Sequence, residues 1–212
     1  MIKILIADDH EIIRTGLKKY IESILPHSEI DEAIDGDTAY EKIKHSIYNL
    51  MILDVNMPDT DSFGLINNIF AIRPDANILI FSMNAEDVYA RKFMQLGVKG
   101  YISKASSTAE IGKAINNVLN NKHYISENLR NTFADEVLGK KKANPFDHLS
   151  SREFEIVQHL VRGESVGEIS KTLNLHTSTI GTHKARILKK MDCKNIIELN
   201  ALAKVYKVVL DD

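Results

Sequence analysis

Three aspartates of this 212-residue chain have the type and placement of a site for a metal ion or a phosphoryl group. Asp8 and Asp9 follow one short apolar run, and Asp54 follows another. Three carboxylates that share one crevice repel each other unless a cation compensates their charge. A hard, oxygen-ligated ion such as Mg²⁺ suits such a set. The sequence therefore predicts a Mg²⁺ site, provided that the fold brings the two runs side by side.

Two further polar residues stand in the same relation to apolar runs. Ser82 follows a fourth run and Lys104 a fifth. A hydroxyl and an ammonium that face a metal-bound carboxylate are what phosphoryl transfer onto that carboxylate requires, because cations neutralise the phosphoryl oxygens while the carboxylate attacks. Helix N-capping accounts for any one aspartate alone. It accounts poorly for five such residues at five run ends, so phosphoryl transfer is predicted.

The elements that must position these residues can be read from the apolar runs. Nearly continuous runs, typical of parallel strands buried on both faces, occupy residues 2–7, 50–53 and 77–81, with weaker candidates at 29–33 and 98–102. Segments of helical period lie between them. Five strands alternating with five helices predict a doubly wound (βα)5 domain of the α/β class. In such sheets the carboxyl ends of the strands form the binding crevice.

The second half of the chain has a different pattern. Residues 122–147 are mostly polar and are expected to form a linker, with a short helix near 133–138 and a basic stretch from Gly139 to Pro145 that contains helix breakers. No strand signal follows. Four helices are predicted, at about 151–162, 165–172, 176–190 and 195–209. The expected fold class is thus α/β plus all-α.

The third of these helices has the features of a DNA-reading element. A tight polar turn, Asn174 to Thr177, separates it from the second helix, as in a helix-turn-helix. One face carries Ile180, His183, Ile187 and Met191, and the other carries Gly181, Thr182, Ala185, Arg186 and Lys189, with Lys184 and Lys190 at the flanks. Small, hydroxyl and basic residues suit the major groove. From these residues alone, a polar four-helix bundle without DNA binding is favoured over a DNA-binding domain.

Composition excludes some classes of protein. Residues 1–139 hold 14 Lys/Arg against 20 Asp/Glu, a net charge of −6, whereas residues 140–212 hold 13 against 9, a net of +4. The basic half makes nucleic acid a candidate partner, although charge alone favours ordinary solvated faces until a motif supports DNA binding. The single cysteine, Cys193, cannot form an internal disulfide. No signal peptide or membrane-spanning run is found, and a cytoplasmic protein without a membrane partner is expected.

Motifs in the first half resemble a known family. Asp8-Asp9-His10, the stretch from Leu53 to Pro58 and the stretch from Gly97 to Lys104 together resemble the receiver domain of NarL/FixJ-type response regulators, over residues 1–121. The resemblance implies that Asp54 accepts phosphate from a histidine kinase or a small phosphodonor. It also implies the roles of its neighbours: Asp9, Asp54 and the backbone carbonyl of Asn56 hold Mg²⁺ with Asp8 beside them, Ser82 and Tyr101 form a switch pair, and Lys104 binds the phosphate.

Motifs in the second half resemble the LuxR-type helix-turn-helix domain, over residues 148–212. They are Leu149-Ser-x-Arg-Glu, Glu168-Ile-Ser, and the helix that contains Thr179, His183 and Lys190. The resemblance implies that this helix reads double-stranded DNA. The implied contacts are Ser178, Gly181, Thr182, Ala185 and Lys189, with Thr179, Lys184 and Arg186 as further candidates. The last helix would provide the contact of a homodimer, formed when the protein is phosphorylated.

Two positions depart from these family patterns. Ser62 stands where the receiver family commonly has glycine, and a positive φ at that turn would make serine unfavourable. Gly181 stands where the helix-turn-helix family often has Lys or Arg, which removes one expected DNA contact and lowers helix propensity. The preferred base sequence is therefore open.

The predicted function is a response regulator transcription factor, whose phosphorylation at Asp54 switches dimerisation and DNA binding. It is not expected to be an enzyme. An aspartate-phosphorylating hydrolase generally needs a second carboxylate two residues after the nucleophile, and Asn56 stands there. The alternative is a phosphorylation-independent DNA-binding protein, whose receiver serves only as a dimerisation or docking scaffold.

Overall fold

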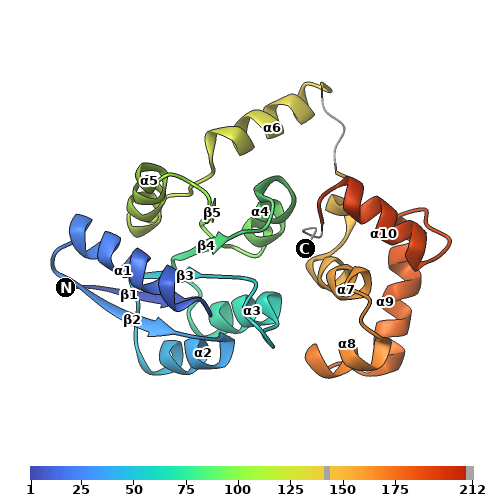
Figure 1. Cartoon of the computed structure of the whole chain (residues 1–212), viewed down its shortest axis with the longest axis horizontal. Helices are drawn as coiled ribbons and strands as arrows, with labels where there is room; N and C mark the ends of the chain where they lie inside the picture. Colours follow the sequence, from blue (N-terminus) through green and yellow to red (C-terminus); the bar gives the residue numbers. More distant parts are fainter. Residues whose placement is uncertain (141–143, 209–212) are drawn as a thin grey trace.

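The computed structural model describes residues 1–140 and 144–208 of the chain. Within them a parallel sheet with flanking helices is followed by a separate group of helices, and one further helix bridges the two parts (Figure 1). The predicted fold class, α/β plus all-α, is confirmed. No helix in the described part is both long and apolar enough to cross a membrane.

The sheet has the strand order β2-β1-β3-β4-β5, and every neighbouring pair is parallel. The strands are β1 (Ile2–Ala7), β2 (Ser28–Ala33), β3 (Leu50–Leu53), β4 (Ile78–Ser82) and β5 (Gly100–Ser103). The chain reverses its direction of winding at β1, so the carboxyl ends of β1 and β3 lie beside each other at the crevice expected for this topology.

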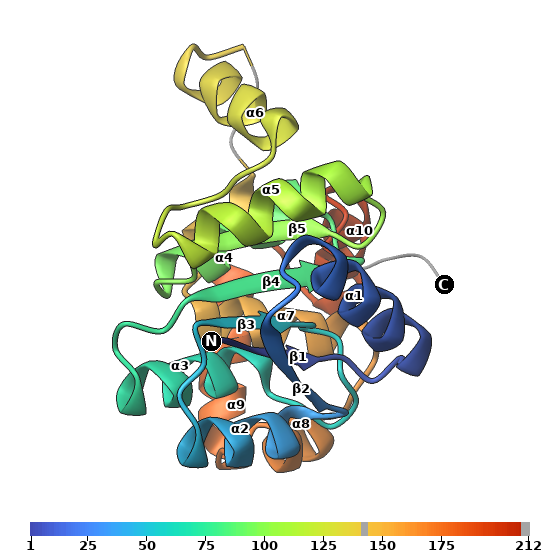
Figure 2. The same ribbon diagram turned by 90° about the vertical axis from the view of Figure 1, so that its left-hand side faces the viewer.

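Both faces of the sheet are covered, which explains why its strands are apolar without alternation. The helices of this domain are α1 (Glu11–Ile24), α2 (Gly36–His45), α3 (Ser62–Ile72), α4 (Glu86–Gln95) and α5 (Thr108–Leu119). Ile4 and Ile52 pack toward α1 and α5, whereas Leu5 and Leu53 pack toward α2, α3 and α4. Figure 2 shows α1 and α5 on the near side of the sheet.

The segment expected as a linker is more ordered than its sequence pattern indicates. It contains α6 (Glu127–Val137) and the short 3-10 helix η1 (Pro145–His148). The expected helix near 133–138 is too short, because Ser126 caps α6 by accepting a hydrogen bond from Leu129 and also donates one to Glu86 on α4. Part of the basic stretch after Gly139 lies outside the described residues.

The second domain consists of α7 (Ser151–Val161), α8 (Val166–Thr172), α9 (Thr177–Lys190) and α10 (Ile196–Val205). Ser150 and Ser165 form complete capping boxes with Glu153 and Glu168, so the sequence defines both helix starts locally. The expected extension of the last helix to residue 209 is wrong, since α10 ends at Val205 and Lys207 has a positive φ of 54°.

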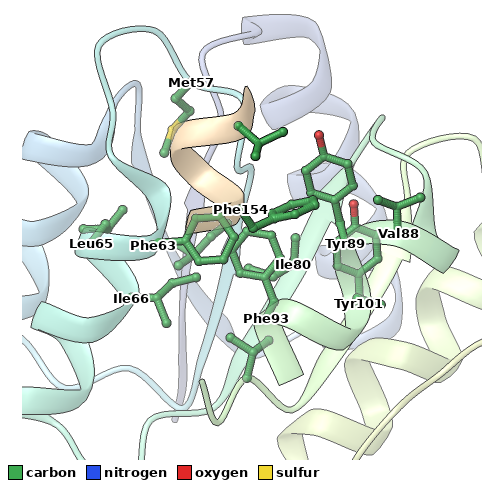
Figure 3. Packing of buried hydrophobic residues seen from close by; sticks show 14 of the residues in the cluster. Met57, Phe63, Leu65, Ile66, Ile80, Val88, Tyr89, Phe93, Tyr101 and Phe154 are labelled. Atoms are coloured by element: carbon green, nitrogen blue, oxygen red, sulfur yellow. The ribbon is translucent and has the colours of Figure 1, made fainter. Parts of the chain in front are cut away.

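The two domains dock through an aromatic cluster. Phe154 of α7 is fully buried and lies between Phe63 of α3 and Tyr89 of α4, with ring centroids 6.3 and 5.3 Å away (Figure 3). Lys92 of α4 is buried as well and donates to the backbone carbonyls of Asp147, at 2.9 Å, and Leu149. The face formed by α3 and α4 therefore holds the beginning of the second domain.

Candidate functional site

The carboxyl ends of three strands converge on a buried ion-pair cluster. Asp8 follows β1, Asp54 follows β3 and Lys104 follows β5. The Lys104 Nζ lies 2.7 Å from Asp54 Oδ2 and 2.7 Å from Asp8 Oδ2. Asp8 and Asp54 are only 1% and 3% exposed. The topology thus brings together carboxylates that are 46 positions apart in sequence.

Further groups complete the acidic cluster. One ligand atom from each of Asp8, Asp9, His10 and Asp54 lies within 4.8 Å of the others. One ring nitrogen of His10 already has a partner within the cluster, because its Nδ1 is 2.8 Å from Asp9 Oδ1. The carboxylate oxygens are the hard donors that Mg²⁺ prefers, so the donor set fits the predicted ion. His10 was quoted in the sequence motif but not predicted as a member of this cluster.

Burial controls the electrostatics of the cluster. Desolvation raises the pKa of Asp54, and the ion pair with Lys104 offsets only part of that effect. Desolvation lowers the pKa of Lys104, but the bonds to Asp54 and Asp8 outweigh it and leave this pKa above its usual value. The cluster carries more carboxylates than cations, so it favours binding of an additional positive charge.

The predicted switch residues belong to one hydrogen-bond network. Ser82 Oγ accepts from the Asn56 side chain and from the Asn84 backbone, both at 3.2 Å. Asn84 Nδ2 donates to Asn56 Oδ1 at 2.8 Å. The Tyr101 hydroxyl points inward and donates to the Asn84 carbonyl at 3.1 Å. Ser82 and Tyr101 are therefore connected through the Asn84 backbone, and their hydroxyl groups also interact with each other.

Asn84 is a member that sequence reasoning missed. It is 6% exposed and lies two residues beyond the end of β4. The rule that singled out Ser82, a polar residue at a strand end, would have reached Asn84 had it been extended by two positions. Burial keeps the Tyr101 ring among apolar neighbours and raises the pKa of its hydroxyl well above the usual value.

In the loop between β3 and α3, Ser62 does not have the positive φ that would make serine unfavourable there. Ser62 is the first residue of α3, and its hydroxyl donates to the Val55 carbonyl at 2.7 Å. The positive φ of this loop, 52°, belongs to Asp59. Aspartate tolerates this conformation better than most residues, so serine at position 62 carries no backbone strain. Its hydroxyl instead closes the loop that begins at Asp54.

The predicted DNA-reading face of α9 is open to solvent. Its exposed members are Ser178, Gly181, Thr182, Ala185, Arg186 and Lys189. Ile180 and Ile187 on the opposite face are fully buried. This segregation fits a helix that packs on its own domain while it presents small and basic residues outward.

The flanking candidates are less free. Thr179 and Lys184 are half-buried, and Lys190, although exposed, donates to Glu153 of the α7 capping box at 2.7 Å. His183 packs inward, and within the described part its buried Nδ1 has no hydrogen-bond partner. The exposed residues of α9 are thus better placed for a DNA contact than Lys190.

A second exposed surface lies on α10. Ile197 is 81% exposed and Val205 is 74% exposed, and the exposed Ala201 lies between them at helical spacing. Leu199 and Ala203 on the other side of α10 are fully buried. An exposed apolar stripe on a short helix is the kind of surface that pairs with another chain.

Comparisons with known proteins agree with this geometry. A family model described as response regulator receiver domain matches residues 4–116, and one described as bacterial regulatory proteins, luxR family, matches residues 147–203. Response regulator UvrY of Escherichia coli K12 is 29% identical over 204 residues, which cover 96% of this chain and 94% of that protein. Response regulator GacA of Pseudomonas aeruginosa is 28% identical, with 96% and 95% covered.

Solved structures show the same fold. RcsB from Salmonella enterica serovar Typhimurium, bound to promoter rprA in the presence of the phosphomimetic BeF3⁻, has a TM-score of 0.75 and 22% identity, and the match covers 96% of this chain and 99% of that one. Another RcsB structure from Salmonella typhimurium has a TM-score of 0.77 and 24% identity, covering 99% and 98%. The family resemblance expected from the motifs is confirmed. Because the receiver model matches more than half of the chain, the chain belongs to the response regulators, as a receiver domain followed by a DNA-binding domain of the luxR family that regulates transcription.

Proposed function

We propose that Asp54 is the phosphoacceptor of this response regulator and that its phosphorylation controls dimerisation and binding to DNA. The observation that carries the proposal is the Lys104 ammonium, held 2.7 Å from the carboxylates of both Asp54 and Asp8. The phosphodonor is a partner histidine kinase or a small acyl phosphate.

The pocket residues have separate parts in the transfer. An Asp54 carboxylate oxygen attacks phosphorus, and the bond from phosphorus to the leaving group of the donor breaks. Lys104 then exchanges part of its contact with Asp54 for the phosphoryl oxygens, whose charge it neutralises. Ser82 can turn its hydroxyl hydrogen toward the phosphoryl oxygens, because its oxygen already accepts from Asn56 and Asn84.

Asp8, Asp9, Asp54 and the backbone carbonyl of Asn56 would hold Mg²⁺, which neutralises charge on the phosphoryl oxygens when bound. The close approach of the carboxylate ligand atoms, within 4.8 Å, supports this assignment. A phosphoryl group adds about −1.5 to −2 charge at pH 7. Ser82 would move toward that charge, and since Asn84 joins Ser82 to Tyr101, the Tyr101 ring would repack with it.

The output is proposed to be binding to double-stranded DNA through Ser178, Gly181, Thr182, Ala185 and Lys189 of α9, with Thr179, Lys184 and Arg186 in lesser contacts. The open face of α9 supports this. The stripe of Ile197, Ala201 and Val205 on α10 supports a homodimer that presents two α9 helices to half-sites about one helical turn apart. Because the partner is DNA, we place the protein in the cytoplasm. Its proposed activity is that of a transcriptional switch and not of an enzyme.

The test measures DNA affinity and oligomeric state with and without acetyl phosphate and Mg²⁺, for the wild type and Asp54→Ala. Asp59→Asn is the matched control, because it removes a carboxylate from the same loop at an exposed position. We expect the phosphodonor to raise dimer content and DNA affinity in the wild type and the control only. Equal binding by all three proteins, with no response to phosphodonor, would instead support the scaffold alternative.

A further inference from the structure

A second cation between two carboxylates lies where the two domains meet. Arg152 on the first turn of α7 donates through Nη1 to Asp61 Oδ2 of the receiver at 2.9 Å and to Glu155 of its own helix. Glu155 is 3% exposed, and Arg152 and Asp61 are largely covered. This cluster of Asp61, Arg152 and Glu155 has no part in the phosphoacceptor pocket.

On the receiver side, the cluster is joined to the phosphoacceptor loop. Asp61 is the last residue of that loop and caps α3 by accepting from the Gly64 backbone at 2.6 Å. The next residue, Ser62, donates to the carbonyl of Val55, which directly follows Asp54. The hydrogen bond from Ser62 to Val55 thus connects the residue after Asp54 to the residue after Asp61.

On the other side, the cluster is joined to the helix-turn-helix. Arg152 Nη2 donates at 2.7 Å to the carbonyl of Leu173, the C-cap of α8. The turn to α9 begins at the next residue, Asn174, whose φ is 48°. One guanidinium thus contacts both the end of the phosphoacceptor loop and the start of the turn that positions the recognition helix.

In the docked state two carboxyl groups share one cation in this cluster. Asp61 and Glu155 both contact Arg152 Nη1, so the two carboxyl groups lie close together around a single guanidinium. Burial, and then the neighbouring Asp61, raise the pKa of Glu155 to about 9, so Glu155 is neutral at pH 7. The pKa of Asp61 lies below its usual value, because the contacts with Glu155, the Gly64 amide and Arg152 outweigh its burial. Arg152 then balances the single remaining negative charge.

We propose that Arg152 is an interdomain latch: it fastens the helix-turn-helix to the phosphoacceptor loop through Asp61 and Leu173, and its release sets the second domain free to reorient. The exposed face of α9 shows what the latch controls. Docking leaves that face open, so undocking changes the orientation in which two copies can present their helices, without uncovering them. The link to phosphorylation rests on the proposed function, whereas the latch contact itself does not.

The test is a double-mutant cycle in the full-length chain, with Arg152→Met, Asp61→Asn and the double variant. Asparagine still caps a helix, so Asp61→Asn keeps α3 and loses only the charge. The undocked fraction is measured by small-angle X-ray scattering, with circular dichroism as a check on folding and Asp59→Asn as the control in the same loop. Each single variant should shift the docking equilibrium by roughly tenfold. The double variant should add little to that shift, because both substitutions remove the same contact between Arg152 and Asp61.

The outcomes separate the latch from the phosphorylation switch. Wild-type scattering from both single variants, or fully additive effects in the double variant, would overturn the latch. Adding Asp61→Asn to Asp54→Ala should undock the chain although phosphodonor no longer acts. If instead the variants undock while phosphodonor has no effect on the wild type, the latch stands and the proposed switch at Asp54 fails.

Discussion

The phosphoacceptor pocket and the interdomain latch use the same arrangement, one cation between two carboxylates, for different ends. In the pocket Lys104 lies between Asp8 and Asp54, and at the interface Arg152 lies between Asp61 and Glu155. Both clusters are desolvated, so neither tolerates an uncompensated charge.

The two clusters differ in how the surplus negative charge is compensated. The pocket includes a third carboxylate, Asp9, which is partly exposed and leaves room for a metal ion. The latch is closed, and a proton on Glu155 removes the surplus charge. The comparison teaches that an accessible excess of carboxylates suits exchange of ligands, whereas a neutral buried carboxyl beside an ion pair suits a contact that is either made or broken.

The largest expected effect is on the rate of phosphorylation, and it should distinguish Lys104 from Arg152. Lys104→Met should lower the rate of phosphorylation at Asp54 by about 10²–10³-fold, because the variant lacks the donor that neutralises the transferred phosphoryl group. Arg152→Met, at the other cluster, should change that rate far less. The measurement is incorporation of labelled phosphate from acetyl phosphate over time. Equal losses in both variants would show that the two clusters do not act separately.

The next effect depends on pH. The pKa of Glu155 is about 9 in the docked state, mainly through burial and then through Asp61, against an ordinary value of 4.5. If undocking returns Glu155 to water, docking is accompanied by uptake of one proton at any pH between 4.5 and about 9. Docking should therefore weaken as pH rises through this window, by at most about 1.4 kcal/mol per pH unit, and level off above about 9.

Glu155→Gln should make docking independent of pH in scattering measured from pH 6 to 9. Other charged groups face the same region: Arg152 and Asp61 in the cluster, and Asp59, His159, Arg162, Glu164 and Glu168 around the adjoining cavity of about 480 Å³. His159, whose Nδ1 is 2.8 Å from Glu164, is the imidazole that lines this cavity, so His159→Gln is the control. A pH response that disappears with His159→Gln and persists in Glu155→Gln would contradict the assignment.

The smallest effect concerns a neutral contact of the same interface. The Tyr89 hydroxyl of α4 donates to the Val208 carbonyl at 2.6 Å, so Tyr89→Phe should weaken docking by about 1 kcal/mol. Tyr48→Phe is a matched control, because the Tyr48 hydroxyl donates at the same distance to Asp31 within the receiver. Thermal unfolding and scattering together should show a loss of docking only for Tyr89→Phe, and a similar undocked fraction in the control would refute the interpretation.

Much of the pocket could be predicted from sequence because its residues occupy strand ends. The apolar runs indicated parallel strands, and parallel strands place their carboxyl ends along one edge, so Asp8, Asp54, Ser82 and Lys104 were expected to meet. The latch could not be predicted in this way. Asp61 and Arg152 are 91 positions apart, and the helix starts at which they lie are accounted for by local capping.

The sequence by itself determined the two domains, the helix and strand types and the acidic cluster, because these depend on hydrophobic periodicity, capping residues and the fixed direction of parallel strands. Tertiary structure alone decided that Asn84 joins Ser82 to Tyr101, that α6 is a full helix, and that Arg152 reaches the receiver. The physical reason is that such contacts depend on how separate surfaces pack and exclude water. No local pattern in either partner encodes that packing.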